Sequence, residues 1–100
     1  MKSIMAQLVM HGRMHTTVAR AKEVRPRLEH LVTIGRRGRV SDLRILQARL
    51  SREAADKLFY EIAPQYRERK GGYLRIVKEA ARRKRDGTPL ARIEFVALRS

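Results

Sequence analysis

The residues best suited to chemistry in this chain are cations gathered around a pair of glycines. From Glu68 to Lys78 the sequence reads ERKGGYLRIVK. Successive backbone amides without Cβ atoms can form a concave anion site, and the planar guanidinium of arginine suits phosphate. The tyrosine beside the glycines could stack on a base or pack against a ribose. The stretch predicts a phosphate-binding loop, with a plain turn between a helix and a strand as the alternative.

A second cationic set surrounds two hydroxyl-bearing residues near the N-terminus. Thr16 and Thr17 precede an apolar helical pattern, so the dipole of a helix N-terminus would add to the positive charge around them. This is also a geometry that binds anions, although ordinary helix capping by Thr17 explains that threonine equally well. The basic residues of the set are Arg13, His15, Arg20 and Lys22.

The balance of charge indicates a polyanionic partner. The 100 residues include 24 Lys and Arg against 10 Asp and Glu, which gives a formal net charge of +14. Self-repulsion of this size opposes compaction unless a polyanion such as nucleic acid neutralises it. Cations are densest between Arg67 and Arg85. The end of that segment, residues 82–85, is either bound along phosphates or an exposed charged loop.

Several classes of site are excluded by what the sequence lacks. There is no cysteine, which rules out disulfides, thiolate metal sites and cysteine nucleophiles. His11 and His15 are separated by Gly12, and no carboxylate completes a ligand set with them or with His30, so we expect no metal. Recognisable enzyme motifs are also missing. We therefore expect no catalysis, no cofactor and no small-molecule substrate. We also expect no membrane contact, because no apolar run approaches the roughly 18 residues of a membrane span.

Apolar spacing predicts two helices and a short strand in the first third of the chain. The first helix ends at Gly12, and residues 13–17 predict an edge strand. Thr17 then caps a long helix that ends near Gly35, in which Pro26 predicts a kink or a short first segment. The apolar faces of the two helices comprise Ile4, Met5, Leu8 and Val9, then Ala21, Val24, Leu28, Leu31 and Val32. The first twenty residues also resemble an acid-poor transit peptide.

Two more helices follow a basic connection, GRRGR, at residues 35–39. Ser41 and Asp42 offer caps for the first of them, whose apolar side carries Leu43, Leu46 and Leu50. Ser51 opens the second, and Pro64 ends it. Its core-facing residues are Ala55, Leu58, Phe59 and Ile62.

The last third of the chain changes to a period of two, which predicts strands over Tyr73–Val77 and Ala91–Phe95. Asp86-Gly87 is a hairpin turn signal, and Pro89 suits the first position of the return strand. The predicted order is α-β-α-α-α-β-β. We therefore expect one two-layer α/β (α+β) domain over residues 1–100, with a small sheet that ends in a β-hairpin.

The sequence also indicates whether the protein recognises bases or the nucleic-acid backbone. The helices after Gly38 have strong apolar stripes and no run of side chains that read base edges in a major groove. Aromatic platforms for single-stranded RNA are not predicted either. What remains is a protein that reads shape and phosphate, as many ribosomal proteins do. A DNA-binding or nucleoid-associated module is the alternative function.

Three stretches resemble the bacterial-type large-subunit ribosomal protein L17 family. They are HTTVARAKEVRP (His15–Pro26), KLFYEIAPQYRERKGGYLRIVK (Lys57–Lys78) and DGTPLARIEFV (Asp86–Val96). The most specific part is Gly71-Gly72-Tyr73-x-Arg75-Ile76. Members of the family usually begin with a basic tail ahead of the first helix, whereas this sequence starts inside that helix, so we expect the tail to be missing.

The resemblance implies a structural constituent of the large ribosomal subunit without catalytic activity. It implies binding to large-subunit ribosomal RNA near the exit side of the polypeptide tunnel, beside neighbouring large-subunit ribosomal proteins. It also implies a cytoplasmic place in the bacterial ribosome, with a mitochondrial or plastid ribosome as the alternative. The motif positions are Thr16, Thr17, Lys22, Arg69, Gly71, Gly72, Tyr73 and Arg75.

The resemblance and the clustering of charge together give one set of expected RNA-binding residues. The set comprises Arg13, His15, Thr16, Thr17, Arg20, Lys22, Arg36, Arg37, Arg39, Arg69, Lys70, Gly71, Gly72, Tyr73, Arg75, Arg82, Arg83, Lys84 and Arg85.

Overall fold

The order of helices and strands is the predicted one. A computed structural model describes residues 2–69, 71–82 and 87–96. The elements are α1 (Lys2–His11), β1 (Arg13–Thr17), α2 (Val18–Gly35), α3 (Val40–Arg49), α4 (Arg52–Lys57), β2 (Leu74–Arg82) and β3 (Pro89–Phe95). The helical path of α4 continues through a π-helical turn, Leu58–Ile62, and a 3-10 turn, Ala63–Tyr66. The mixed α/β class is thereby confirmed.

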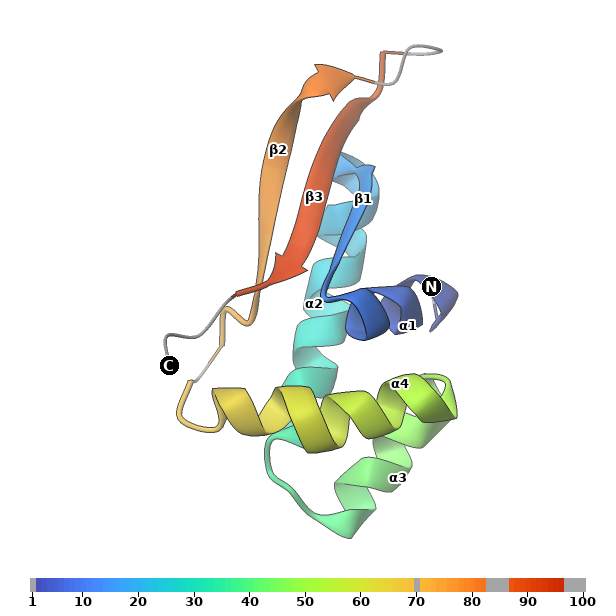
Figure 1. Ribbon diagram of the computed structural model, residues 1–100, viewed down its shortest axis with the longest axis vertical. Helices are drawn as coiled ribbons and strands as arrows, with labels where there is room; N and C mark the ends of the chain where they lie inside the picture. The colour runs from blue at the N-terminus through green and yellow to red at the C-terminus, as the bar shows by residue number, and fades with distance from the viewer. Residues whose placement is uncertain (1, 70, 83–86, 97–100) are drawn as a thin grey trace.

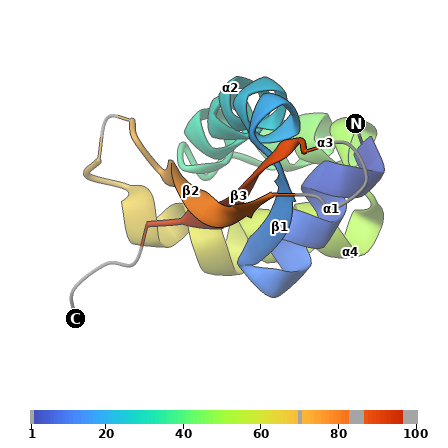
Figure 2. The same ribbon diagram turned by 90° about the horizontal axis from the view of Figure 1, so that it is seen from above.

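The sheet within the described residues has three antiparallel strands in the order β1-β3-β2. β1 is an edge strand, as predicted. The register aligns Met14, Ile93 and Ile76 in one row and Arg13, Glu94 and Arg75 in the next. Because successive side chains point to opposite faces of a sheet, the apolar row packs toward α2 and the charged row lies on the other face. Figures 1 and 2 show α2 running along one face of the strands.

The long helix begins as predicted but passes through its proline. Thr17 is the N-cap, and its hydroxyl oxygen accepts a hydrogen bond from the amide of Arg20 at 3.1 Å. α2 then runs unbroken past Pro26, so the expectation of a short first segment was wrong. Pro26 and Lys22 are both exposed, so water can satisfy the Lys22 carbonyl that loses its helical donor.

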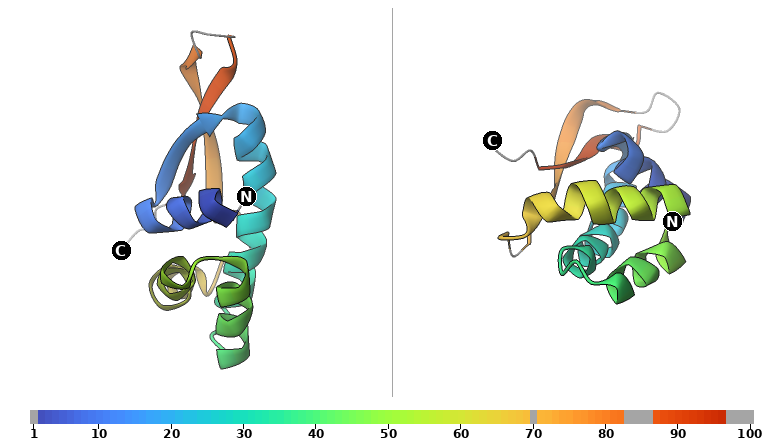
Figure 3. Two further views of the ribbon diagram at one scale, coloured as in Figure 1. Left: turned by 90° about the vertical axis from the view of Figure 1, so that its right-hand side faces the viewer. Right: turned by 60° about the horizontal axis from the view of Figure 1, so that its bottom comes forward.

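α3 and α4 form a helical base below the lower end of the sheet, and the β2–β3 hairpin projects away from that base (Figures 1 and 3). The N-cap of α3 is Arg39 rather than Ser41, which is exposed inside the helix, so Ser41 was wrongly expected to cap it. Ser51 caps α4 as predicted, accepting from the amide of Ala54 at 3.3 Å. Pro64 does not end the helical path, because proline is tolerated in the first turn of the 3-10 segment that follows.

The core joins the sheet, α2 and the base. Its fully buried side chains include Leu8, Leu28, Leu46, Leu58 and Ile93. A Cβ at Gly35 would lie 3.1 Å from Cδ1 of Leu46, so the glycine at the end of α2 allows α3 to pack closely. Three aromatic rings, Tyr66, Tyr73 and Phe95, close the lower end of the sheet against the base.

The hairpin is longer than the sequence predicted. β2 extends to Arg82, and its register shifts between Lys78 and Arg82. Pro89 opens β3, which confirms its predicted position. Asp86 of the predicted turn lies outside the described residues, and Gly87 has a φ of +68°.

Candidate nucleic-acid interface

The glycine pair forms a loop in which the Gly71 carbonyl and the Gly72 amide are already bonded within the protein. The amide of Gly72 donates to Oε1 of Glu29 at 3.1 Å, and Nε of Arg69 donates to the carbonyl of Gly71 at 3.1 Å. Gly72 has a φ of +66°, where a side chain is strained. The Gly72 amide of the predicted anion nest therefore binds a carboxylate of α2. This corrects the expectation that the Gly72 amide is open to a phosphate.

Glu29 is a site residue that sequence reasoning missed. Its second carboxylate oxygen, Oε2, lies 2.8 Å from Nε of Arg25, and 19% of its side chain is exposed. The i,i+4 spacing of Arg25 and Glu29 was visible in the sequence, but the contact with Gly72 spans 43 positions along the chain. Glu29 thus holds the glycine loop against α2 and orients a neighbouring arginine.

Tyr73 supports the loop from inside instead of facing a ligand. It is only 1% exposed, and its ring centroid lies 5.3 Å from that of Tyr66 in an edge-on contact. Its hydroxyl donates to the carbonyl of Arg69 at 3.1 Å. The expectation that Tyr73 stacks on a base was therefore wrong, because the residue precedes β2 and turns into the core.

The open face of the sheet, which follows the glycine loop in the chain, carries a cluster of Arg75 and Arg92 around Glu94. Nε of Arg75 lies 2.9 Å from Oε1 of Glu94, and Arg92 reaches the same oxygen at 3.3 Å. Burial raises the pKa of Glu94, but the hydrogen bonds and charges of Arg75 and Arg92 outweigh it and leave the pKa below its usual value. Glu94 is therefore ionised at neutral pH, while 57% of the Arg75 side chain stays exposed.

The N-terminal set is divided between two surfaces. Arg13 and His15 lie on the same sheet face as Arg75, where Nδ1 of His15 lies 2.8 Å from Oε1 of Glu79. Thr16 faces the α2 side of the sheet. Arg20 and Lys22 are on the first turns of α2. The side chains of Arg13, Arg20 and Lys22 are exposed, and they bond to no residue in the described part of the chain.

The basic connection is organised around one buried acid. Asp42 is 1% exposed, and its two oxygens lie 2.9 Å from Nη2 of Arg37 and 3.1 Å from Nε of Arg39. Burial raises the pKa of Asp42, but hydrogen bonds from Arg39 and the charges of Arg37 and Arg39 outweigh it, leaving the pKa below its usual value. Arg36 is directed elsewhere, toward the carbonyl of Tyr66 at 3.4 Å.

The remaining predicted cations fall at the limits of what the structure describes. Arg82 is the last residue of β2. Lys70, Arg83, Lys84 and Arg85 lie outside the described residues.

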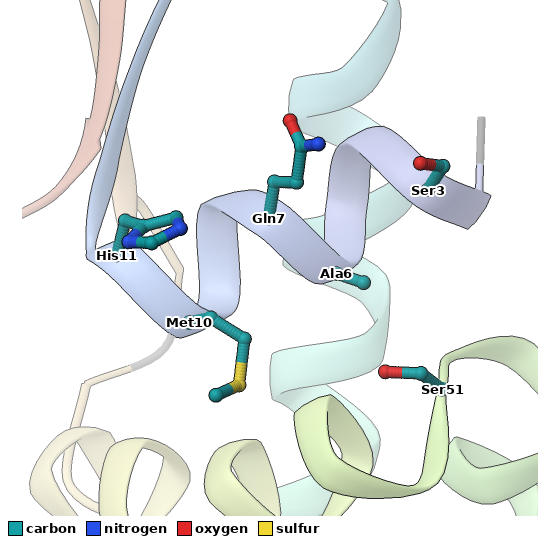
Figure 4. Close-up of a pocket in the computed structure, with 6 residues that line it drawn as sticks. All are labelled: Ser3, Ala6, Gln7, Met10, His11 and Ser51. Carbon is teal, nitrogen blue, oxygen red and sulfur yellow. The ribbon is translucent and has the colours of Figure 1, made fainter.

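A hollow without Lys, Arg, Asp or Glu in its lining lies between α1 and the start of α4 (Figure 4). It measures about 480 Å³, and Met10 extends into it from α1. No lining residue carries a fixed charge, so this hollow does not resemble a phosphate site. The residues around it are Ser3, Ala6, Gln7, Met10, His11 and Ser51.

Metal-binding clusters and membrane spans are both missing from the described ranges, 2–69, 71–82 and 87–96. No group of three or more His, Asp or Glu side chains within them is arranged to hold a metal ion. None of the helices there combines the length and the apolar character that crossing a membrane requires.

Comparison with known proteins points to one family. The family model described as ribosomal protein L17 matches residues 1–96. The large ribosomal subunit protein bL17 of Thermus thermophilus is 47% identical over 90 residues, covering 89% of this chain and 76% of the relative. The protein of the same name from Persephonella marina is 50% identical over 91 residues, covering 89% and 73%. That of Sphingopyxis alaskensis is 46% identical over 96 residues, covering 95% and 68%. The resemblance of the sequence motifs is thereby confirmed: the chain belongs to the ribosomal protein L17 family.

Proposed function

We propose that this protein is a structural constituent of the large ribosomal subunit and binds large-subunit ribosomal RNA by its phosphates and shape. The relatives are named as proteins of that subunit, and the formal net charge of +14 suits a polyanionic partner. The other partners proposed are neighbouring large-subunit ribosomal proteins. Since the matched relatives are bacterial, the proposed location is the cytoplasmic ribosome of a bacterium.

The observation that carries this proposal is a repeated pairing of an exposed arginine with a more deeply buried carboxylate. The side chain of Arg75 is 57% exposed and that of Glu94 is 13% exposed. Arg39 and Asp42 show the same contrast at 61% and 1%. Each carboxylate fixes one side of a guanidinium, whose other N–H donors remain directed outward. Fixing the side chain beforehand lowers the entropy lost when it meets a phosphate.

The surface chemistry favours recognition of the RNA backbone over recognition of bases. Tyr73, two positions before Arg75, is buried. On the open sheet face, β3 presents Leu90, Arg92 and Glu94, and the neighbouring strands add Arg13 and Arg75. The described residues of this face include no Phe, Tyr or Trp, and its His15 is paired with Glu79, so it lacks a broad platform for unstacked bases. Arginines suit phosphates of any sequence.

Neutralising Arg69 of the glycine loop and Arg75 of the sheet face tests the proposal. The variant Arg69→Gln/Arg75→Gln should bind large-subunit RNA more weakly, and the slope of log affinity against log salt should fall by about 0.7–0.9 for each phosphate that the variant no longer neutralises. The matched control is Arg44→Gln/Arg52→Gln, which removes two exposed cations from α3 and α4. Filter binding at several salt concentrations gives both slopes. An equal slope for wild type and Arg69→Gln/Arg75→Gln would place both arginines away from RNA.

Sedimentation tests the ribosomal part of the proposal separately. The wild-type protein should travel with large subunits through a gradient at moderate salt. Recovery of the cellular protein free of ribosomes would contradict the proposal.

A further inference from the structure

A hollow of about 210 Å³ lies where α1, α2 and α3 meet. Met5 and Leu31 form an apolar floor, with 7% and 2% of their surfaces exposed. Arg27 and His30 come from α2 and Arg49 from α3, and all three are exposed around the floor. The sequence does not mark these residues as a site, because only the packing of α3 against α2 brings Arg49 to the other two.

The cations of this hollow differ from the arginine clusters around Asp42 and Glu94 in having no internal acid. Within the described part of the chain, Arg27, His30 and Arg49 form no hydrogen bond or ion pair through their side chains. By contrast, Arg37 and Arg39 bind Asp42, and Arg75 and Arg92 bind Glu94. Two guanidinium groups at one hollow repel each other, so an anion that enters is favoured by both charges at once.

The hollow also lies on a different side of α2 from the glycine loop. Lys22, Arg25 and Glu29 line a separate hollow beside Ile76 of β2. At 3.6 residues per turn, those positions and the positions of Arg27 and His30 fall on different sides of the helix. Any ligand at Arg27 and Arg49 is therefore distinct from one bound at the loop and the sheet face.

We propose that this hollow is a second RNA-binding site, which takes one backbone phosphate between Arg27, His30 and Arg49 and a ribose over Met5 and Leu31. Arginine forks suit the phosphate oxygens, and an imidazole N–H supplies a further donor. The volume is below the roughly 300–1,000 Å³ of sites that enclose a whole small molecule, so a phosphate with its sugar fits better than a complete free nucleotide. The site rests on the proposed function, and it predicts that RNA contacts both sides of α2.

The double variant Arg27→Gln/Arg49→Gln tests the site. Its affinity for large-subunit ribosomal RNA should fall about tenfold or more, since the variant cannot form the charge-assisted hydrogen bonds. Its salt slope should fall by about 0.7–0.9 for each phosphate that it no longer neutralises. Filter binding with full-length protein gives both values. Arg44→Gln/Arg52→Gln removes the same charge elsewhere and should keep at least half of the wild-type affinity.

A charge-conserving variant distinguishes the proposed phosphate contact from general attraction. Arg27→Lys/Arg49→Lys keeps both charges but loses the fork geometry, so its affinity should fall while its salt slope stays near the wild-type value. Thermal unfolding of all variants identifies any loss of RNA affinity that is caused by misfolding.

The outcomes separate this site from the proposed function. If wild type binds large-subunit RNA and Arg69→Gln/Arg75→Gln weakens it, but Arg27→Gln/Arg49→Gln binds like wild type, the second site is wrong and the proposed function stands. If wild type itself does not bind the RNA, the proposed function fails. If poly-glutamate, matched to large-subunit RNA in charge concentration, bound wild type more tightly than the RNA did and Arg27→Gln/Arg49→Gln lost that preference, the hollow would be assigned to an acidic protein and the proposal would be overturned.

Discussion

Asp42 shows how a single buried acid can hold two arginines of a basic surface in place. The residue is 1% exposed, yet two guanidinium groups and the Arg39 amide keep it ionised. The sequence indicated a capping role for Asp42, and its Oδ2 does accept from the Arg39 amide at 3.3 Å. The ion pair with Arg37 could not be predicted, because it depends on how the two-glycine connection turns. The buried acid thereby fixes two arginines that would otherwise repel each other.

The lowered pKa of Asp42 predicts a specific loss of stability in acid. The folded-state pKa lies below the usual value of 3.8, so the stabilisation is present above that value and is lost as pH falls through the folded-state pKa. Asp42→Asn should be less stable than wild type at pH 7, and its free energy of unfolding should fall less steeply below about pH 4. Urea unfolding between pH 7 and pH 2 measures this.

Asp56→Asn provides the control for that titration. It removes the same charge from α4, where the carboxylate accepts from the Gln47 amide at 3.2 Å. This variant should retain the wild-type fall in stability on acidification that Asp42→Asn loses. Identical pH profiles for Asp42→Asn and wild type would show that the Asp42 ion pairs do not contribute to stability.

At the scale of elements, the glycine loop is positioned by a helix that is distant in sequence. Glu29→Ala removes the acceptor for the Gly72 amide and the partner of Arg25. We expect the free energy of unfolding to fall by about 1–2 kcal/mol, at the low end for charged hydrogen bonds because the site is partly exposed. Denaturant unfolding measures it. Glu23→Ala, an exposed glutamate of the same helix, should change stability by less than about 0.5 kcal/mol; equal losses would mean that Glu29 does not hold the loop.

The elements themselves could be predicted because their signals are local. Apolar spacing and the Thr17 cap located α2, and Pro89 located the start of β3. The orientation of Tyr73 could not be predicted from alternation, since the residue lies before the strand begins. The hydrogen bond of the Gly72 amide could not be predicted either, because its partner on α2, Glu29, is 43 residues away in the chain. Local patterns thus predicted the helices and strands, and tertiary contacts decided which side chains and amides are paired or buried.

At the scale of the whole molecule, charge is distributed on several surfaces instead of one patch. Arg75 lies on the open sheet face, Arg37 and Arg39 at the helical base, and Arg27 and Arg49 around the hollow between helices. With principal extents of 45 × 29 × 18 Å, such a molecule presents separate cationic surfaces in different directions. That distribution suits a protein surrounded by several segments of a folded RNA better than one lying along a single straight duplex.

Competition binding tests the central claim, which is selective binding of large-subunit ribosomal RNA, most directly. Labelled large-subunit ribosomal RNA is bound by the wild-type protein and challenged with unlabelled large-subunit RNA, small-subunit RNA or duplex DNA. The competitors are matched in phosphate concentration and salt, since non-specific affinity depends on both. We expect large-subunit RNA to compete at least about tenfold better than either of the others. Equal competition by all three, or stronger competition by duplex DNA, would contradict the account.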